Sequence, residues 1–157
     1  MKSVLFVCLG NICRSPTAEA VFRARAAARD LERALRIDSA GTGDWHLGKA
    51  PDERARQAAA GRGYDLSALR ARQVTPQDLE RFDLVLAMDD DNLRDLQRLG
   101  AGGAPTGLYR FMDFHPDASV TEVPDPYYGG AGGFEHVLDL IEVASDELLD
   151  WIQREGS

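Results

Sequence analysis

The sequence is poor in the residues that build disulfide frameworks and metal sites. It has two cysteines, Cys8 and Cys13, and cysteines five positions apart can close only a very small loop. The three histidines, His46, His115 and His136, are scattered, so no Cys/His cluster has the spacing of a zinc site. No apolar run approaches the roughly 18 residues that a membrane-spanning helix requires. These absences argue against a disulfide-stapled domain, a zinc module and a transmembrane protein.

Basic residues are outnumbered in this chain. Its 157 residues include 18 Lys and Arg against 26 Asp and Glu, which gives a formal net charge of −8. A nucleic-acid surface needs a clustered basic face, so we expect no nucleic-acid partner. A bound anion would have to be attracted by a local arrangement of groups, because the overall field repels it.

Length and composition indicate one globular domain covering residues 1–157. A chain of this length can bury about two-thirds of the surface that its unfolded form exposes, and 44% of its residues are hydrophobic. The apolar run at residues 4–8 is too short for the core of a signal peptide and is typical of a first strand. We therefore expect a cytoplasmic protein with no membrane span.

Short apolar runs alternate with helical patterns along the chain. Strands are predicted at residues 4–8, 35–39, 84–88 and 108–111. Helices are predicted from about residue 16 with Ser15 as the N-cap, over 52–60, from 75, and from 89 to Gly100. A C-terminal helix is predicted from an apolar stripe formed by Phe134, Val137, Leu138, Ile141, Leu148, Trp151 and Ile152. The Pro-, Asp- and Gly-rich stretch 112–133 is predicted to be a long loop of functional importance.

This alternation predicts an α/β fold. We expect a four-stranded parallel sheet with helices on both faces and a phosphate-binding loop after the first strand. Ligands bind such sheets outside the carboxyl ends of the strands. Cys8 ends the first predicted strand, so a ligand site and a nucleophilic side chain are expected at the same place.

The segment from Cys8 to Pro16 has the composition of an anion-binding loop with a nucleophile. Cysteine attacks as the thiolate, which a helix N-terminus and a guanidinium group both stabilise. Gly10 and Asn11 tolerate the positive φ needed to wrap backbone N–H groups around one point. Arg14 offers a planar fork that matches two phosphate oxygens. A Cys six residues before an Arg is common by chance, but the preceding strand and the Ser-Pro helix start add specificity. The absence of a following Gly-Lys-Ser/Thr excludes a nucleotide-binding Walker loop.

Two motifs in this sequence resemble those of one known family. The N-terminal motif closely resembles the signature of the low-molecular-weight protein tyrosine phosphatases; it reads Val7-Cys8-Leu9-Gly10-Asn11-Ile12-Cys13-Arg14-Ser15-Pro16, followed by Ala18-Glu19. The second motif resembles the family's general-acid loop and reads Asp125-Pro126-Tyr127-Tyr128-Gly129. The motifs occur in the family's order, and the resemblance covers nearly the whole chain.

The resemblance implies hydrolysis of phosphotyrosine through a cysteinyl-phosphate intermediate. It implies that Cys8 is the nucleophile, that Arg14 clamps the phosphate, and that Asp125 is first the general acid and then the general base. Taken alone, an aspartate before a proline would indicate only a turn. The loop residues expected to bind phosphate are Leu9, Gly10, Asn11, Ile12, Cys13 and Ser15. The resemblance implies no metal or other cofactor.

A substrate slot is also implied by the resemblance. Trp45, Tyr127 and Tyr128 resemble the aromatic walls that the family places beside its active site, although aromatic residues in loops often pack only locally. A slot of this kind suits a phosphotyrosine ring. The expected partner is a phosphotyrosine-containing protein, with a tyrosine kinase as one candidate.

Supporting residues follow from the same resemblance, with one departure. Asn11, Ser15 and Ser39 resemble the residues that shape the family's loop and hydrogen-bond its thiolate. Many members carry a histidine where this chain has Leu69. We therefore expect one supporting hydrogen bond to be missing, which affects the rigidity of the loop rather than its chemistry.

Alternatives remain for Cys13 and for the function. Cys13 either packs as a small hydrophobic residue or captures an oxidised Cys8 as a reversible disulfide. An arsenate reductase-like thiol enzyme would need further cysteines near residues 87–94, where the sequence has none. A non-catalytic phosphotyrosine-binding module would lack the nucleophile or the acid, and both are present.

Overall fold

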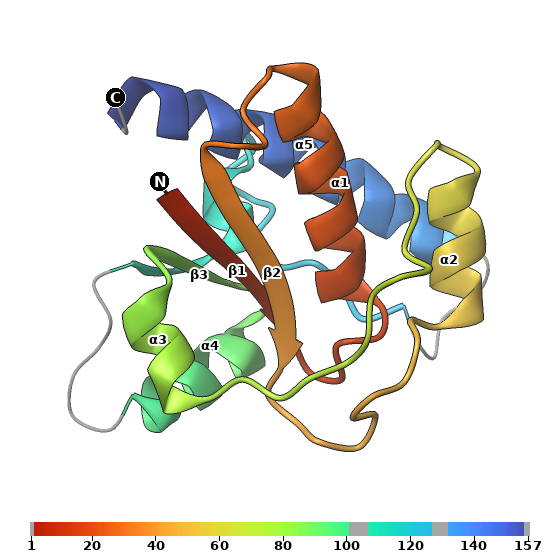
Figure 1. The fold of residues 1–157 in the computed structure, drawn as a ribbon, viewed down its shortest axis with the longest axis vertical. Coiled ribbons are helices and arrows are strands. Elements are labelled where there is room, and N and C mark those ends of the chain that lie inside the picture. Colours follow the sequence, from red (N-terminus) through yellow and green to blue (C-terminus); the bar gives the residue numbers. More distant parts are fainter. Residues whose placement is uncertain (1, 101–106, 127–131, 156–157) are drawn as a thin grey trace.

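The computed structural model describes residues 2–100, 107–126 and 132–155, which form an α/β fold (Figure 1). Its four parallel strands make one sheet in the order β2-β1-β3-β4. The strands are β1 (Lys2–Cys8), β2 (Leu35–Gly41), β3 (Leu84–Ala87) and β4 (Leu108–Arg110). The predicted four-stranded parallel sheet is confirmed.

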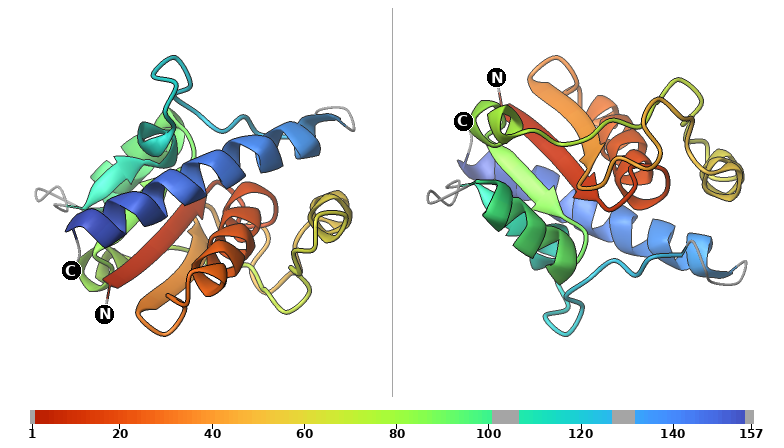
Figure 2. Two further views of the ribbon diagram at one scale, coloured as in Figure 1. Left: turned by 90° about the horizontal axis from the view of Figure 1, so that it is seen from above. Right: turned by 90° about the horizontal axis from the view of Figure 1, so that it is seen from below.

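Helices cover both faces of the sheet, as predicted (Figure 2). They are α1 (Arg14–Ala28), α2 (Glu53–Ala60), α3 (Pro76–Arg81), α4 (Asp90–Leu99), α5 (Gly132–Glu155) and the short 3₁₀ helix η1 (Phe111–Phe114). α1 and α5 pack side by side on one face, with α2 beside them, while α3 and α4 cover the other face (Figures 1 and 2). Both faces of the central strands are therefore removed from water.

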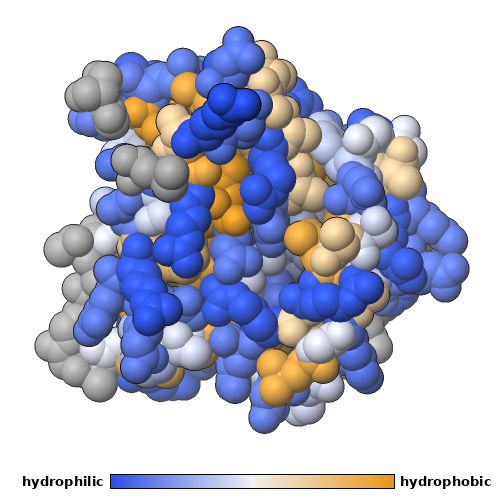
Figure 3. Space-filling view, viewed as in Figure 1, coloured by the Kyte–Doolittle hydropathy of each residue, from blue (hydrophilic) through white to orange (hydrophobic). Residues whose placement is uncertain are grey.

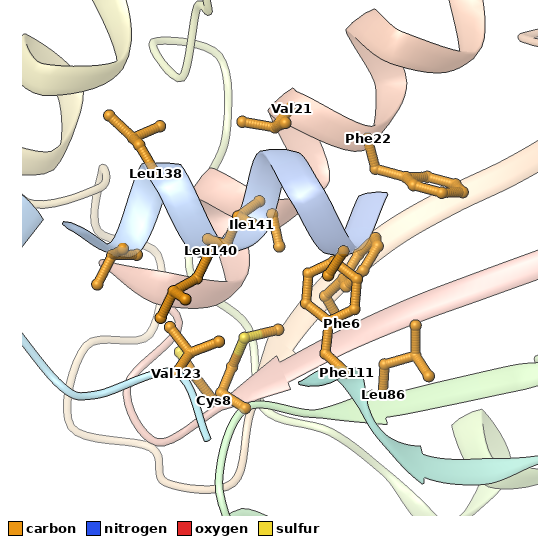
Figure 4. Close-up of a cluster of buried hydrophobic side chains, with 14 of the residues drawn as sticks. Phe6, Cys8, Val21, Phe22, Leu86, Phe111, Val123, Leu138, Leu140 and Ile141 are labelled. Carbon is orange, nitrogen blue, oxygen red and sulfur yellow. The ribbon is translucent and has the colours of Figure 1, made fainter. Parts of the chain in front are cut away.

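The alternation of side chains along β1 divides the core into two clusters. Phe6 and Cys8 belong to the cluster under α1 and α5, together with Phe22 and Ile141 (Figure 4). Val7 belongs to the cluster on the opposite face. A strand buried on both faces reads as a continuous apolar run, which is why β1 was recognisable in the sequence.

The parallel register brings the carboxyl ends of the strands to one edge of the sheet. Cys8 at the end of β1 pairs with Gly41 at the end of β2, and Val7 pairs with Ala87 at the end of β3. The start of β1 and the end of α5 lie at the opposite end of the molecule (Figures 1 and 2). The loops that follow the strands therefore gather around Cys8.

The start of α1 differs from the prediction. The helix begins at Arg14, and its N-cap is Cys13, whose side chain makes no capping hydrogen bond. The expectation that Ser15 caps a helix starting near residue 16 is therefore wrong. The loop after β1 turns directly into helical backbone at Arg14, so Ser15 is already inside the helix and its hydroxyl points to Cys8, with Oγ 3.0 Å from Sγ.

The segment 112–133 is also more ordered at its start than predicted. Phe111 and Met112 are buried in η1, and the Phe111 ring lies 5.0 Å from the Phe6 ring, centroid to centroid. Packing of this aromatic ring on the sheet orders a helical turn that a count of Pro, Asp and Gly does not reveal. The chain then has no regular element from residue 115 to 126, and residues 127–131 lie outside the described ranges.

The other helix signals in the sequence are confirmed. Asp52, Thr75 and Asp89 are the N-caps of α2, α3 and α4, and each side chain accepts a hydrogen bond from a backbone N–H in the first turn of its helix. The predicted apolar stripe of α5 is buried at Phe134, Val137, Leu138, Ile141, Leu148 and Ile152. Trp151 is half-buried at the edge of this stripe.

The face drawn in Figure 3 is mostly hydrophilic, with hydrophobic residues showing between the polar ones. This surface agrees with the share of charged residues in the sequence, which is 28%. Among the parts of the chain that the structure describes, no helix is both long and apolar enough to cross a lipid bilayer.

Candidate active site

A cavity of about 410 Å³ opens at the edge of the sheet where β1 ends. Cys8 lies at this edge with only 3% of its surface exposed. The cavity is lined by Cys8, Leu9, Gly10, Ile12, Cys13, Arg14, Trp45, His46 and Asp125. The three residues that the family resemblance singled out for catalysis therefore meet in one place, although Asp125 is more than 100 positions from the others.

The loop after Cys8 curls around its sulfur. Asn11 adopts a positive φ of 56°, as predicted, and its backbone N–H donates a hydrogen bond of 3.2 Å to Cys8 Sγ. Gly10, the other residue expected to tolerate a positive φ, does not adopt one. A Cβ atom at Gly10 would lie 2.9 Å from Cδ2 of the His46 ring, so a larger residue there would push this partly exposed ring aside.

Polar side chains support this loop from below. Ser15 Oγ lies 3.0 Å from Cys8 Sγ and 3.3 Å from the carbonyl oxygen of Ala40. The Asn11 amide donates one hydrogen bond to Ser15 Oγ (2.8 Å) and another to Ser39 Oγ (3.1 Å). The structure thus brings together the three residues that were predicted to support the loop.

The departure at Leu69 leaves none of the hydrogen-bonding groups of Asn11 unused. Leu69 packs against the apolar core. The Asn11 amide oxygen accepts a hydrogen bond of 3.0 Å from the backbone N–H of Arg72. Its amino group donates to the hydroxyl oxygens of Ser15 and Ser39. These three bonds support the loop from segments other than position 69, and the expected effect of Leu69 on the rigidity of the loop stays a prediction.

Arg14 is a buried cation held by fixed partners. Its side chain is 3% exposed, and Nη1 donates to Asp89 Oδ2 (2.7 Å) and to the carbonyl oxygen of Val123 (2.9 Å). Burial acts to lower the pKa of Arg14, but the nearby Cys8, Asp89 and Asp125 outweigh it, and the pKa is raised above its ordinary value. The guanidinium therefore stays charged at the floor of the cavity.

Asp125 lies at the mouth of the cavity. Its side chain is 38% exposed, and Oδ2 is 3.8 Å from Arg14 Nη2. The segment before it is tied down at Val123, whose backbone N–H donates to Met88 (2.8 Å) and whose carbonyl accepts from Arg14. These two hydrogen bonds hold Asp125 near the sulfur of Cys8 although the segment has no regular secondary structure.

Apolar side chains also line the cavity. Leu9 and Trp45 are 41% and 66% exposed, and Ile12 is nearly buried. The Trp45 ring lies so close to Gly43 that a Cβ atom there would be 2.0 Å from it. The structure places Trp45 at the cavity, as the resemblance implied. The other two predicted wall residues, Tyr127 and Tyr128, lie outside the described residues.

Cys13 is a second buried thiol on the same cavity. Burial raises its pKa far above the ordinary value, and the negative charges of Asp52, Cys8 and Asp125 act in the same direction. The two cysteines are both free thiols in this structure. Cys13 is thus a thiol that burial keeps protonated, and it lines the same cavity as Cys8.

Sequence reasoning missed several residues of this site. His46 follows the predicted wall residue Trp45, yet its place on the cavity depends on a loop conformation that no local pattern indicates. Asp89 was recognised only as a helix-starting residue, although its position directly after β3 could have placed it at the ligand-binding edge. Among the described residues, no group of three or more His, Cys, Asp or Glu side chains could hold a metal ion.

Sequence comparison relates the chain to proteins of one kind. A family model described as low molecular weight phosphotyrosine protein phosphatase matches residues 3–157. The low molecular weight protein-tyrosine-phosphatase YfkJ of Bacillus subtilis is 44% identical over 155 residues, which cover 99% of this chain and 98% of that protein. A putative low molecular weight protein-tyrosine-phosphatase of Synechocystis, slr0328, is 45% identical over 157 residues and 97% of each chain.

Solved structures share the fold over its whole length. The crystal structure of YfkJ from Bacillus subtilis matches with a TM-score of 0.95 and covers 100% of this chain and 98% of its own. DARP, a Drosophila arginine phosphatase, matches with a TM-score of 0.91 at 31% identity and covers 99% of both chains. The fold is therefore found in proteins named for tyrosine and in one named for arginine.

Proposed function

Because the chain belongs to the low molecular weight phosphotyrosine protein phosphatase family, and is thus a protein tyrosine phosphatase, we propose that it hydrolyses phosphotyrosine through a cysteinyl-phosphate on Cys8. One observation carries this mechanism. Cys8, Arg14 and Asp125 line one cavity, where a thiol, a fixed cation and a carboxyl group surround the space in which a phosphate would bind.

In the first step, the Cys8 thiolate attacks phosphorus and the bond from phosphorus to the tyrosine oxygen breaks. The electron pair of that bond leaves with the phenolic oxygen, and Asp125 donates the proton that makes it a neutral phenol. The position of Asp125 at the mouth of the cavity suits this role, since the leaving oxygen faces away from the sulfur. The product is the phosphorylated Cys8 and an ionised Asp125.

In the second step, water attacks phosphorus and the sulfur–phosphorus bond breaks. Asp125 takes a proton from the attacking water, and the electron pair of the broken bond returns to sulfur as the thiolate. Inorganic phosphate then leaves, and Cys8 and Asp125 regain their starting protonation states. The hydrogen bond from Asn11 N–H to Cys8 Sγ stabilises the thiolate as nucleophile and as leaving group.

Arg14 holds the equatorial phosphate oxygens in both steps, together with backbone N–H groups of the loop other than that of Asn11, which bonds to Cys8 Sγ. Charge is spread over these oxygens in the transition state, so fixed donors around them lower the barrier. The bonds from Arg14 to Asp89 and Val123 keep the guanidinium in place before substrate arrives. A cation that is already oriented loses little freedom when phosphate binds.

The substrate is a phosphotyrosine-containing protein, and a tyrosine kinase is one candidate. The apolar wall of Leu9, Ile12 and Trp45 suits the ring of a phosphotyrosine. A phosphoarginine places no aromatic ring against this wall and so buries less apolar surface there. Tyr127 and Tyr128 are proposed to complete the slot. We place this activity in the cytoplasm and give the enzyme no nucleic-acid partner.

The test of the mechanism is turnover of p-nitrophenyl phosphate by the pure protein in the presence of EDTA. Cys8→Ser should lower turnover by about a thousandfold or more, because a serine hydroxyl is scarcely ionised near neutral pH. Cys13→Ser makes the same change of atoms in the same loop and should keep most of the activity. Activity that survives in Cys8→Ser, or that EDTA removes from wild type, would refute the mechanism.

Selectivity is tested with peptides that carry phosphotyrosine, phosphoserine or phosphoarginine at the same position. We expect kcat/KM to be at least about tenfold higher for phosphotyrosine, because only this residue places an aromatic ring against the apolar wall. Phosphoarginine turnover equal to or above that of phosphotyrosine would assign the chain the substrate for which DARP is named.

A further inference from the structure

Glu19 is a buried carboxyl group that none of the steps above uses. It lies on α1 one turn after Ser15 and is only 4% exposed. Its Oε1 accepts a hydrogen bond of 2.7 Å from Ser39 Oγ, and its Oε2 accepts one of 2.9 Å from Arg23 Nη2. Asp and Glu are almost never fully buried unless they are paired, and these two contacts are the pairing that Glu19 requires.

A continuous relay of hydrogen bonds connects Glu19 to the sulfur of Cys8 through Ser39, Asn11 and Ser15. Ser39 Oγ, which donates to Glu19, accepts from the Asn11 amide at 3.1 Å. The same amide donates to Ser15 Oγ at 2.8 Å, and Ser15 Oγ lies 3.0 Å from Cys8 Sγ. All five side chains are buried, so water is a poor substitute for any link.

The direction of each hydrogen bond in this relay follows from the groups that can only donate or only accept. A backbone N–H can only donate, so the bond from Arg72 N–H fixes the oxygen of the Asn11 amide on that side. The Asn11 amino group must then face both serines, and each serine oxygen accepts one bond from it. Each serine has a single proton left to donate.

The remaining protons have few acceptors. The proton of Ser39 goes to Glu19, because Ser39 Oγ donates to Oε1. The proton of Ser15 has two acceptors within reach, the Cys8 sulfur at 3.0 Å and the Ala40 carbonyl at 3.3 Å. Ser15 can therefore donate to a Cys8 thiolate and turn to Ala40 when the sulfur carries a proton or a phosphoryl group.

We propose that Glu19 is a positioning residue: as the terminal acceptor of this relay, it holds Ser39, Asn11 and Ser15 so that Ser15 donates to the Cys8 thiolate. This role rests on the proposed function of Cys8 as the nucleophile. Without an acceptor at position 19, the Ser39 side chain has to change its rotamer to reach another one, and this moves its Oγ away from the Asn11 amide. Asn11 then loses one of its two acceptors, and the loop that carries its N–H to Cys8 loosens.

Glu19 serves the relay as a carboxylate. Burial raises the pKa of Glu19 above its ordinary value, and the charge of Asp38 acts in the same direction; the hydrogen bonds from Ser39 and Arg23 lower the pKa without reversing this shift. Two donors face its two oxygens, so a proton on either oxygen would set a donor against a donor. Arg23 Nη2 also donates to the Ile37 carbonyl at 2.8 Å, which anchors the guanidinium beside the carboxylate.

The test compares Glu19→Met with Glu19→Gln. Methionine has nearly the shape of glutamate but no oxygen acceptor, whereas glutamine keeps one oxygen that can accept from Ser39. The amino group of glutamine then faces Arg23, whose side chain is 51% exposed and can turn to water. The main measurement is the rate of iodoacetamide alkylation at Cys8 against pH, read by fragment-ion mass spectrometry so that Cys13 is counted separately. This measurement needs no phosphatase activity, so it separates the relay from the proposed function.

In Glu19→Met the midpoint of the Cys8 alkylation curve should rise by about one pH unit. At a given pH, the ratio of Cys8 thiolate to thiol is then about tenfold lower. Turnover of aryl phosphate at a pH below the new midpoint should fall about tenfold in kcat, with KM little changed. In Glu19→Gln the midpoint and kcat should stay within about threefold of wild type, because the acceptor for Ser39 remains.

Two further variants exclude a merely structural effect. Glu142→Met removes a partly buried glutamate of α5 that accepts hydrogen bonds from Arg25 of α1 and from Tyr64, and that has no contact with the relay. It should lower the melting temperature and leave the alkylation midpoint unchanged. Ser39→Ala breaks the next link of the relay with little change in volume. Because both substitutions break one chain, Glu19→Met and Ser39→Ala should not add when combined.

A wild-type alkylation midpoint in folded Glu19→Met would overturn the proposal. So would an equal loss in Glu19→Gln and Glu19→Met, because charge rather than an acceptor would then matter. If Glu19→Met does not fold, Ser39→Ala alone decides, and a wild-type midpoint there overturns the relay. A shifted midpoint in a protein that hydrolyses no aryl phosphate would support the relay and refute the proposed function.

Discussion

At the scale of single residues, Asp125 offers the clearest test of a chemical role. Its carboxyl group lies on the cavity that holds Cys8, and Asn in its place can neither donate the same proton nor act as a base. Asp125→Asn should lower kcat by about a hundredfold for phosphotyrosine, whose leaving oxygen needs a proton. The loss should be smaller for aryl phosphates whose phenols are more acidic, measured as a plot of log kcat against leaving-group acidity.

The same segment contains a control for Asp125→Asn. Asp117 lies in the same irregular stretch, bonds locally to Ser119 and does not line the cavity. Asp117→Asn should leave turnover unchanged for every leaving group. A loss in Asp125→Asn that is equal across all leaving groups would move the acid role to another residue.

Substitution can also separate the two alternatives for Cys13, packing in the loop and capture of an oxidised Cys8. Peroxide should convert the Cys8 thiolate into a sulfenic acid, which condenses with a thiol to a disulfide and water. Cys13 lines the same cavity and is the only other cysteine in the sequence. After peroxide and then a thiol reductant, wild type should recover most of its activity, whereas Cys13→Ser should recover several-fold less.

The linkage itself is checked by mass spectrometry of the oxidised wild type, where a Cys8–Cys13 disulfide removes two mass units. Cys13→Ser without peroxide serves as the control for activity. Equal recovery of the two proteins would mean that Cys13 only packs in the loop, which is the alternative that the sequence left open.

At the scale of elements, a network of charged side chains ties α1 and α5 together. Glu142 on α5 accepts hydrogen bonds from Arg25 on α1, from Arg62 and from Tyr64, and its side chain is 20% exposed. Burial acts to raise the pKa of Glu142, but the hydrogen bonds from Tyr64, Arg25 and Arg62 outweigh it and lower the pKa below 4.5. The ionised form is therefore the one that the fold stabilises.

The pH dependence of stability follows from the direction of this shift. A carboxyl group whose pKa is lowered in the folded state stabilises the protein above its unfolded value of 4.5. The contribution is lost as the pH falls through the lower, folded value. Glu142→Gln should reduce the free energy of unfolding by about 1–3 kcal/mol at neutral pH and by much less near pH 3, measured by urea unfolding. An equal difference at both pH values would show that charge is not involved.

At the scale of the whole molecule, the net charge of −8 opposes the binding of anionic substrates. Exposed charges are screened by salt, while Arg14 at the cavity floor is buried and is screened much less. For a phosphotyrosine peptide flanked by acidic residues, kcat/KM should therefore rise by about two- to threefold between 20 and 200 mM NaCl. The local attraction persists while the long-range repulsion is removed.

A peptide of the same length with basic flanking residues provides the control. Its kcat/KM should fall over the same range of salt, because the overall field attracts it. Parallel changes for the two peptides would mean that salt acts on the cavity itself rather than on the approach of the substrate.

Much of this molecule could be predicted because the signals are local. Short stretches of sequence predict the strands that end near Cys8 and Ala87. They also predict helices that start near residues 52 and 75, and the structure agrees with them. The predictions that were wrong depend on neighbours distant in sequence or on the path of the backbone. Ser15, for example, lies inside α1 with its hydroxyl at Cys8 instead of capping the helix.

The sequence alone determined the order of the elements, the parallel sheet and the family, because hydrophobic periodicity, caps and the two motifs depend on neighbouring residues. Only the tertiary structure decided which groups meet at the sulfur. Asp89 reaches Arg14 across 75 positions, and Glu19 reaches Ser39 across 20. Hydrogen bonds depend on distances of a few tenths of an ångström, and the packing of helices on a twisted sheet sets those distances. No pattern along the chain contains them.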